Sequence, residues 1–136
     1  MTAHPHCKYN LDFTLVLKTK DNKSFFNEAM LCRVKEIVKK LSSENDIELT
    51  GFDGHENHIK LNLLMHPNLT PSKFINSLKT VTSRHLRKEF PIQQSQFYYK
   101  ERVIWDRGYC LVTSGDFGHT IDTYLNNEMS VHDKNR

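Results

Sequence analysis

The chain has few cysteines, few glycines and prolines, and no long hydrophobic run. Its three cysteines lie far apart among 136 residues, at positions 7, 32 and 110. This odd count at wide spacing excludes a disulfide framework and a Cys-x-x-Cys zinc pair, and it favours a reducing cytoplasm. No apolar run approaches the ~18–20 residues of a membrane span. The first six residues lack the charged start and the apolar stretch of a signal peptide.

The composition is that of a small folded domain. The chain has 5 glycines and 4 prolines, and 38% of its residues are hydrophobic, 26% charged and 10% aromatic, which argues against disorder. We expect a single domain over residues 1–136, with residues 1–10 as an arm and residues 130–136 as a charged tail. Neither a glycine-rich phosphate loop nor a Gly-x-Ser-x-Gly elbow is present, so both of these sites are excluded.

Positive charge is concentrated in the middle of the chain. The net charge is only +3, but residues 60–102 contain eight lysines and arginines against two glutamates. A local excess of this kind suits a polyanion such as nucleic acid. Composition alone supports a solvated helix face equally well.

Hydrophobic periodicity predicts the element order β-α-β-β-α-β-α. Strands are expected at 11–18, 47–52, 57–63 and 103–113, and helices at about 28–43, 70–90 and 119–129. Asn27 and Thr70 are the expected helix caps, and Pro71 suits the first turn. A turn is expected at Asp53-Gly54 and a loop over 91–100. The order predicts an α+β, ferredoxin-like (split βαβ) antiparallel sheet with helices on one face, plus a C-terminal helix.

The expected strand at 57–63 carries a row of polar side chains. Alternation places His58, Lys60 and Asn62 opposite Ile59 and Leu61. If helices cover the apolar face, the polar row lies on the open face of the sheet. Plain solvent exposure explains this row. A metal or phosphate site, with His58 as a ligand, explains it as well.

Two further groups of side chains suit nucleic-acid chemistry. Tyr124 and Glu128 are one helical turn apart, so the pair is either ordinary packing or a nucleophile beside a metal-binding carboxylate. The helix over 70–90 carries basic and polar side chains that can form hydrogen bonds to phosphates. Aromatic residues follow it and either stack on unpaired bases or pack in the core, which we favour for Trp105. They are Phe97, Tyr98, Tyr99 and Trp105.

Five segments, in order, resemble one known family. The chain is similar to the small single-tyrosine transposases of the HUH nuclease superfamily, encoded by the 200/605 family of insertion sequences. The first strand with its basic turn (13–20) and the His-hydrophobic-His strand (56–61) match two family segments. The basic helix (71–91), the Trp-x-Arg-Gly-aromatic strand (105–109) and the tyrosine helix (121–128) match three more. The resemblance covers residues 11–128.

The resemblance implies a fold, a reaction and a set of partners. The family has the ferredoxin-like fold and works as homodimers in which the tyrosine helix of one subunit completes the other's site. It binds DNA hairpins near element ends and cuts single-stranded DNA through a 5′-phosphotyrosine, with Mg²⁺ or Mn²⁺ as cofactor. By position Tyr124 is the nucleophile, and His58 and Glu128 are the metal ligands. We expect a bacterial or archaeal cytoplasmic protein associated with the nucleoid. The expected DNA contacts are Lys73, Arg84, Arg87, Lys88 and Arg107.

One position departs from the family pattern. Lys60 replaces the second histidine of the HUH pair, and a protonated lysine cannot ligate a metal. Three outcomes are open: His55 or Asn62 fills the gap, Lys60 itself contacts the scissile phosphate as a catalytic residue, or cutting is impaired.

We therefore predict a transposase that cleaves and rejoins single-stranded DNA at hairpin-flanked element ends. The alternative is a catalytically impaired, domesticated relative that binds hairpins and acts as a regulator, which Lys60 favours. A third reading is an RNA-binding module of similar topology, in which Tyr124 has no role.

Overall fold

The computed structural model describes residues 11–98, 104–113 and 124–125. The predicted arm and tail lie outside these residues, as does most of the predicted helix at 119–129, Glu128 included. The described residues form four strands, three α-helices and a short 3-10 helix, η2 (Lys20–Asn22).

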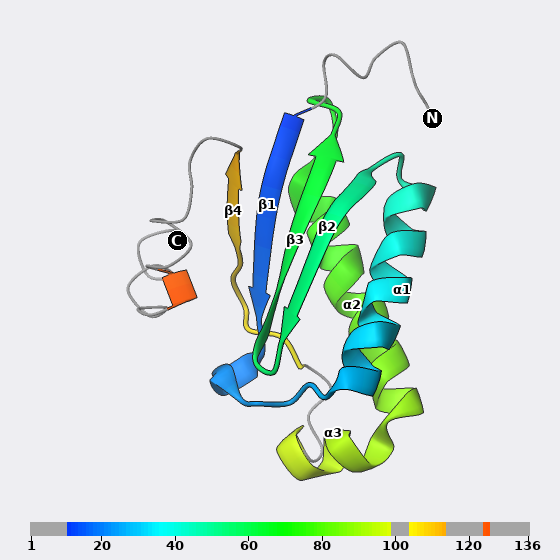
Figure 1. Cartoon of the computed structure of the whole chain (residues 1–136), viewed down its shortest axis with the longest axis vertical. Helices are drawn as coiled ribbons and strands as arrows, with labels where there is room; N and C mark the ends of the chain where they lie inside the picture. Colours follow the sequence, from blue (N-terminus) through cyan, green and yellow to red (C-terminus); the bar gives the residue numbers. More distant parts are fainter. Residues whose placement is uncertain (1–10, 99–103, 114–123, 126–136) are drawn as a thin grey trace.

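The four strands make one antiparallel sheet in the order β2-β3-β1-β4 (Figure 1). Their bounds are Leu11–Lys18 for β1, Glu48–His55 for β2, His58–Met65 for β3 and Cys110–Thr113 for β4. A helix follows β1 and another follows β3, so each half of the chain is a split βαβ unit. The predicted ferredoxin-like architecture is confirmed.

Helix α2 (Pro71–Glu89) lies behind the sheet in Figure 1, and helix α1 (Glu28–Glu44) stands to the right of β2. Asn27 caps α1 as predicted, its side-chain oxygen accepting the N–H of Met30 at 2.9 Å. Thr70 stands at the cap position of α2, but its side chain makes no capping hydrogen bond. No helix in the described ranges is long and apolar enough to cross a membrane.

The core lies between this helical layer and one face of the sheet. Strand alternation directs Leu15, Leu17 and Leu61 toward the helices, and all three are fully buried. The helices complete this core with side chains at helical spacing. They include Met30, Val34, Val38, Phe74, Ile75 and Leu78.

Residues 91–98 form a helix, α3 (Pro91–Tyr98), so the predicted loop over 91–100 is wrong for this part. The segment is rich in glutamine and has no apolar stripe of helical period, which removes the usual signal. Tertiary contacts hold it in place instead. Gln93 donates to the carbonyl of Phe25 at 3.0 Å, and the Tyr98 hydroxyl donates to the carbonyl of Lys20 at 2.8 Å.

Asp53 and Gly54 lie inside β2, so the predicted turn there is also wrong. The hairpin turns at Glu56 and Asn57 instead. Gly54 has a packing role, because a Cβ at this position would lie only 2.8 Å from a methyl group of Leu31 on α1. The glycine permits close approach of helix and strand.

The predicted strand over 103–113 is shorter than expected, because β4 begins only at Cys110. Upstream of it, Trp105 forms a single antiparallel bridge with Thr19. Lys79 of α2 holds this segment by hydrogen bonds. Its ammonium donates to the carbonyl of Asp106 at 2.8 Å and to those of Arg107 and Gly108 at 3.1 Å each. Lys79 adds to two backbone hydrogen bonds of this segment, in which Ile104 accepts from Lys20 and Asp106 donates to Lys18, both at 2.8 Å.

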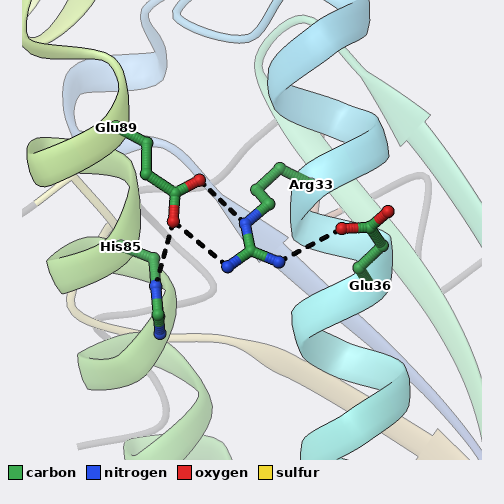
Figure 2. A network of polar contacts seen from close by, with 4 residues as sticks. All are labelled: Arg33, Glu36, His85 and Glu89. Atoms are coloured by element: carbon green, nitrogen blue, oxygen red, sulfur yellow. Dashed lines mark hydrogen bonds and ion pairs between the residues drawn. The ribbon is translucent and has the colours of Figure 1, made fainter.

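An ionic bridge joins α1 to α2 (Figure 2). The guanidinium of Arg33 donates to both oxygens of Glu89, at 2.8 and 3.1 Å, and to Glu36 at 3.1 Å. His85 contacts the same Glu89 carboxylate at 3.1 Å. The hydrogen bond from Arg33 is the largest effect and lowers the pKa of Glu89. Burial opposes it as the second effect, and the hydrogen bond from His85 lowers the pKa further by a smaller amount.

This bridge is expected to make stability depend on pH. The native pKa of Glu89 lies below its unfolded value, so the stabilisation is complete above the unfolded value of ~4.3 and is lost as pH falls through the native pKa. Glu89→Gln should therefore lower the free energy of unfolding by under ~1 kcal/mol near neutral pH, since the side chains are partly exposed. The difference should vanish in acid. Urea unfolding across pH checks this, and Glu36→Gln, at a side chain 69% exposed, should show a smaller effect.

Candidate active site on the open sheet face

The polar row of β3 lies on the face of the sheet opposite α1 and α2, as predicted. Lys18 of β1 stands opposite His58, and Val16 stands opposite Lys60. Partners in an antiparallel pair share a face, so these side chains lie together. The Thr14 hydroxyl donates to the Asn62 side-chain oxygen at 3.1 Å, a contact across the same face.

His58 is half-buried and held in a defined orientation. Its Nδ1 lies 2.9 Å from the side-chain oxygen of Asn57. Because an amide oxygen only accepts, Nδ1 carries the proton and Nε2 is the basic nitrogen. Burial, and then the neighbouring His55, lower the pKa of His58 to about 4, with smaller contributions from Lys60 and Lys18. The ring is therefore neutral at pH 7.

The described neighbours of His58 do not fit a divalent cation. His55 stacks on His58 with ring centroids 4.3 Å apart and planes 16° apart. A metal binds in the plane of its imidazole, so two stacked rings cannot share one ion in this arrangement. His55 instead contacts Asp53 at 3.1 Å. Residues 11–98, 104–113 and 124–125 contain no group of three or more histidine, cysteine, aspartate or glutamate side chains suited to a metal.

The remaining predicted metal contacts give no better fit. Asn62 accepts the hydrogen bond from Thr14, and Glu128 lies outside the described residues. Lys60 and Lys18 place two positive charges beside His58, which oppose a cation and suit an anion.

Tyr124 lies on this same face of the sheet, because it packs with Val16, which shares the face of Lys60, and with residues of β4. Its ring is fully buried and packs with Val16, Cys110 and Val112. The ammonium of Lys18 lies 4.5 Å from the ring centroid, a cation–π contact. Because Lys18 stands opposite His58, the tyrosine is one strand away from the polar row of its own chain.

The five predicted DNA-contact residues do not form one cluster. Arg87 and Arg107 line a cavity of about 520 Å³ between α2 and the segment before β4. Lys73 lines a second cavity, of about 270 Å³, at the start of α2. Arg84 and Lys88 are exposed on α2. The helical layer thus presents separate basic positions.

The predicted base-stacking aromatics are mostly structural. Trp105 is 1% exposed, and its indole N–H donates to the hydroxyl of Thr82 at 2.8 Å, which confirms the packing role. Tyr98 is buried, Phe97 is partly buried, and Tyr99 lies outside the described residues.

Sequence reasoning missed Lys18. Alternation already put it on the face opposite Leu15 and Leu17, but its partner in the sheet depends on the pairing of β1 with β3. Register between strands far apart in sequence is not readable from either strand alone.

Comparisons with known proteins agree with this architecture. The chain resembles the transposase for insertion sequence element IS200 of Salmonella typhimurium, strain LT2, with 25% identity over 124 residues, 91% of this chain and 80% of the relative. The same element's transposase from Salmonella typhi matches to the same extent.

Two solved structures share the fold. A proposed transposase from Deinococcus radiodurans R1 superposes with a TM-score of 0.78 at 23% identity, covering 93% of this chain and 97% of that one. A REP-associated tyrosine transposase bound to a REP hairpin superposes with a TM-score of 0.60 at 7% identity, covering 96% and 74%. A model of the IS200-like transposases matches residues 7–128, nearly the whole chain. The chain belongs to the IS200-like transposase family.

Proposed function

We propose that this transposase cuts and rejoins single-stranded DNA through a covalent bond to Tyr124. The observation that carries the proposal is the position of Tyr124 on the same sheet face as His58, beside Lys18. A phenol is a competent nucleophile toward phosphorus once it is deprotonated. Family membership supplies the class of reaction.

The proposed step is a transesterification. The Tyr124 oxygen loses its proton and forms a bond to phosphorus, while the bond from phosphorus to the 3′ oxygen of the preceding nucleotide breaks. The leaving 3′ oxygen gains a proton. The products are a 5′-phosphotyrosine and a free 3′ hydroxyl, and the reverse attack by another 3′ hydroxyl rejoins the strand.

The DNA partner we propose is a hairpin near the cutting site. A structural neighbour is a tyrosine transposase bound to a REP hairpin, and basic residues on α2 supply phosphate contacts here. The buried Nε of Arg87 has no hydrogen-bond partner among the described residues and lies at the cavity it shares with Arg107. A phosphate there would satisfy it. We place the protein in the cytoplasm with the nucleoid.

In its own chain the Tyr124 ring is fully buried, so the segment that carries it must shift before the phenol meets a phosphate. We propose that this shift takes place within a homodimer, in which the tyrosine segments and polar rows of two subunits combine.

The proposal is tested by following a labelled strand onto the protein. A pool of single-stranded hairpins with randomised flanks is incubated with the full chain in Mg²⁺, in Mn²⁺ or in EDTA, and denaturing gels show any adduct. A 3′ label should transfer to the protein and a 5′ label should not, because the 5′-phosphotyrosine retains the downstream DNA. Tight binding without an adduct under all three conditions rejects cutting and leaves a hairpin-binding regulator.

A second prediction tests whether a basic residue beside the helical layer contributes to DNA binding. Arg107→Gln should weaken binding of DNA hairpins and make the plot of log affinity against log salt less steep by roughly 0.7–0.9, the value of one phosphate contact. Arg107 is exposed, so the fold should be unaffected. Fluorescence anisotropy over a salt series measures both quantities, and Lys35→Gln on α1 is the control. Identical slopes for the two variants contradict the contact.

A further inference from the structure

The open sheet face brings together two lysines, one on β1 and one on β3. Lys18 is opposite His58, and Lys60 is two residues further along β3. The two lysines are therefore diagonal neighbours on one face, roughly 7–8 Å apart at the backbone, which is within reach of long side chains. Both contribute positive charge at the His58 ring.

Lys18 also contacts the nucleophile that we propose. Its ammonium lies 4.5 Å from the Tyr124 ring centroid, and the side chain is only 2% exposed. The shift of the Tyr124 segment that the reaction requires would uncover this ammonium, so a phosphate held there would lie close to the tyrosine. Lys60 is partly exposed, so a phosphate can reach its ammonium group from solvent.

We propose that Lys18 and Lys60 form a phosphodiester-binding pair beside His58, and that their ammonium groups take the place of a divalent cation. The inference rests on the proposed function and names the groups that stabilise the attacked phosphate. Charge-assisted hydrogen bonds to a phosphate are among the strong ones, and a partly buried site strengthens them. The poor fit of the described His58 neighbours to a metal supports the same conclusion.

The pair leaves the chemistry of the step unchanged. Phosphorus gains the Tyr124 oxygen and loses the 3′ oxygen, and the lysines keep their protons throughout. Their role is to stabilise the added negative charge on the two non-bridging oxygens as the bond to Tyr124 forms. No oxidant, reductant or further reactant is needed.

The test measures phosphate binding in the absence of metal. The full chain is titrated in EDTA with a random-sequence 20-nucleotide single strand over a salt series, and with inorganic phosphate while the His58 ring resonances are followed by NMR. Lys60→Gln should lower affinity for the single strand about tenfold, since it removes one charged hydrogen bond, and flatten the salt plot by ~0.7. It should also abolish the phosphate-induced shift at His58. Lys40→Gln, an exposed lysine on α1, should leave all three unchanged.

A gain-of-function variant separates the lysine pair from a metal site. Lys60→His restores the family's histidine pair, so it should bind Mn²⁺ more tightly than the wild type by electron paramagnetic resonance. It should also lose the metal-free phosphate shift. Lys18→Met keeps a similar side-chain length but removes the charge, so it should also lose the phosphate-induced shift at His58. Thermal melting checks that this variant folds.

Three results overturn the inference: equal affinity and slope in Lys60→Gln and Lys40→Gln, Mn²⁺ binding as tight in the wild type as in Lys60→His, or an adduct that forms only with added metal. A missing adduct together with lysine-dependent phosphate binding rejects the cutting reaction alone and leaves the binding pair standing.

Discussion

Tyr124→Phe is expected to abolish the covalent protein–DNA adduct, by at least about a thousandfold in rate, because the only atom removed is the attacking oxygen. The ring itself stays, so the packing against Val16, Cys110 and Val112 and the contact with Lys18 are retained. We expect the fold to be preserved and the affinity for hairpins to change little. Adduct yield on denaturing gels, with a 3′-labelled strand, measures the effect.

The control for this variant is a second tyrosine. Tyr109, just before β4, is half-buried, and its ring lies 5.8 Å from the ammonium of Lys79. Tyr109→Phe removes the same atom from a place unrelated to the open face, and the adduct should form as in the wild type. An adduct that persists in Tyr124→Phe, or one that is lost equally in Tyr109→Phe, would falsify the assignment of the nucleophile.

Trp105→Ala is expected to give the largest loss of stability. The side chain is 1% exposed, lies 5.4 Å from Phe26 between ring centroids, and donates to Thr82. Its removal leaves a cavity and a buried hydroxyl without its donor, so the free energy of unfolding should fall by roughly 3–5 kcal/mol. The urea midpoint should fall while the slope of the transition stays constant.

Two further variants make this prediction specific. Arg107→Ala, two residues along the same segment, concerns an exposed side chain and should change stability by less than ~0.5 kcal/mol. Trp105→Phe should fall between the two, because it keeps an aromatic ring and loses the hydrogen bond to Thr82. A loss in Trp105→Ala no larger than in Arg107→Ala would contradict the central position of the indole.

Much of the fold was predictable because the signals are local. Alternation in 57–63 placed His58 and Lys60 on the open face, and Asn27 marked the start of α1. The failures have a common cause, which is that tertiary contacts override local signals. The glutamines of α3 carry no helical stripe, and Gly54 belongs to a strand through its pairing with Ile59 of β3.

The site was predictable only in part for a related reason. The sequence pattern identified His58, Lys60 and Tyr124, but the position of Lys18 between them depends on the register of two strands far apart in the chain. The stacking of His55 on His58 likewise depends on the pairing across the β2–β3 hairpin. Contacts of this type are a property of the assembled sheet.

The irregular pairing of β2 has a consequence for behaviour at high concentration. In the described sheet β2 is an outer strand, and its register with β3 shifts between Leu49 and Gly51. Asp53 is exposed on the same strand. A bulged, charged edge strand is a poor template for the backbone of another chain, so this edge of the sheet resists amyloid-like stacking.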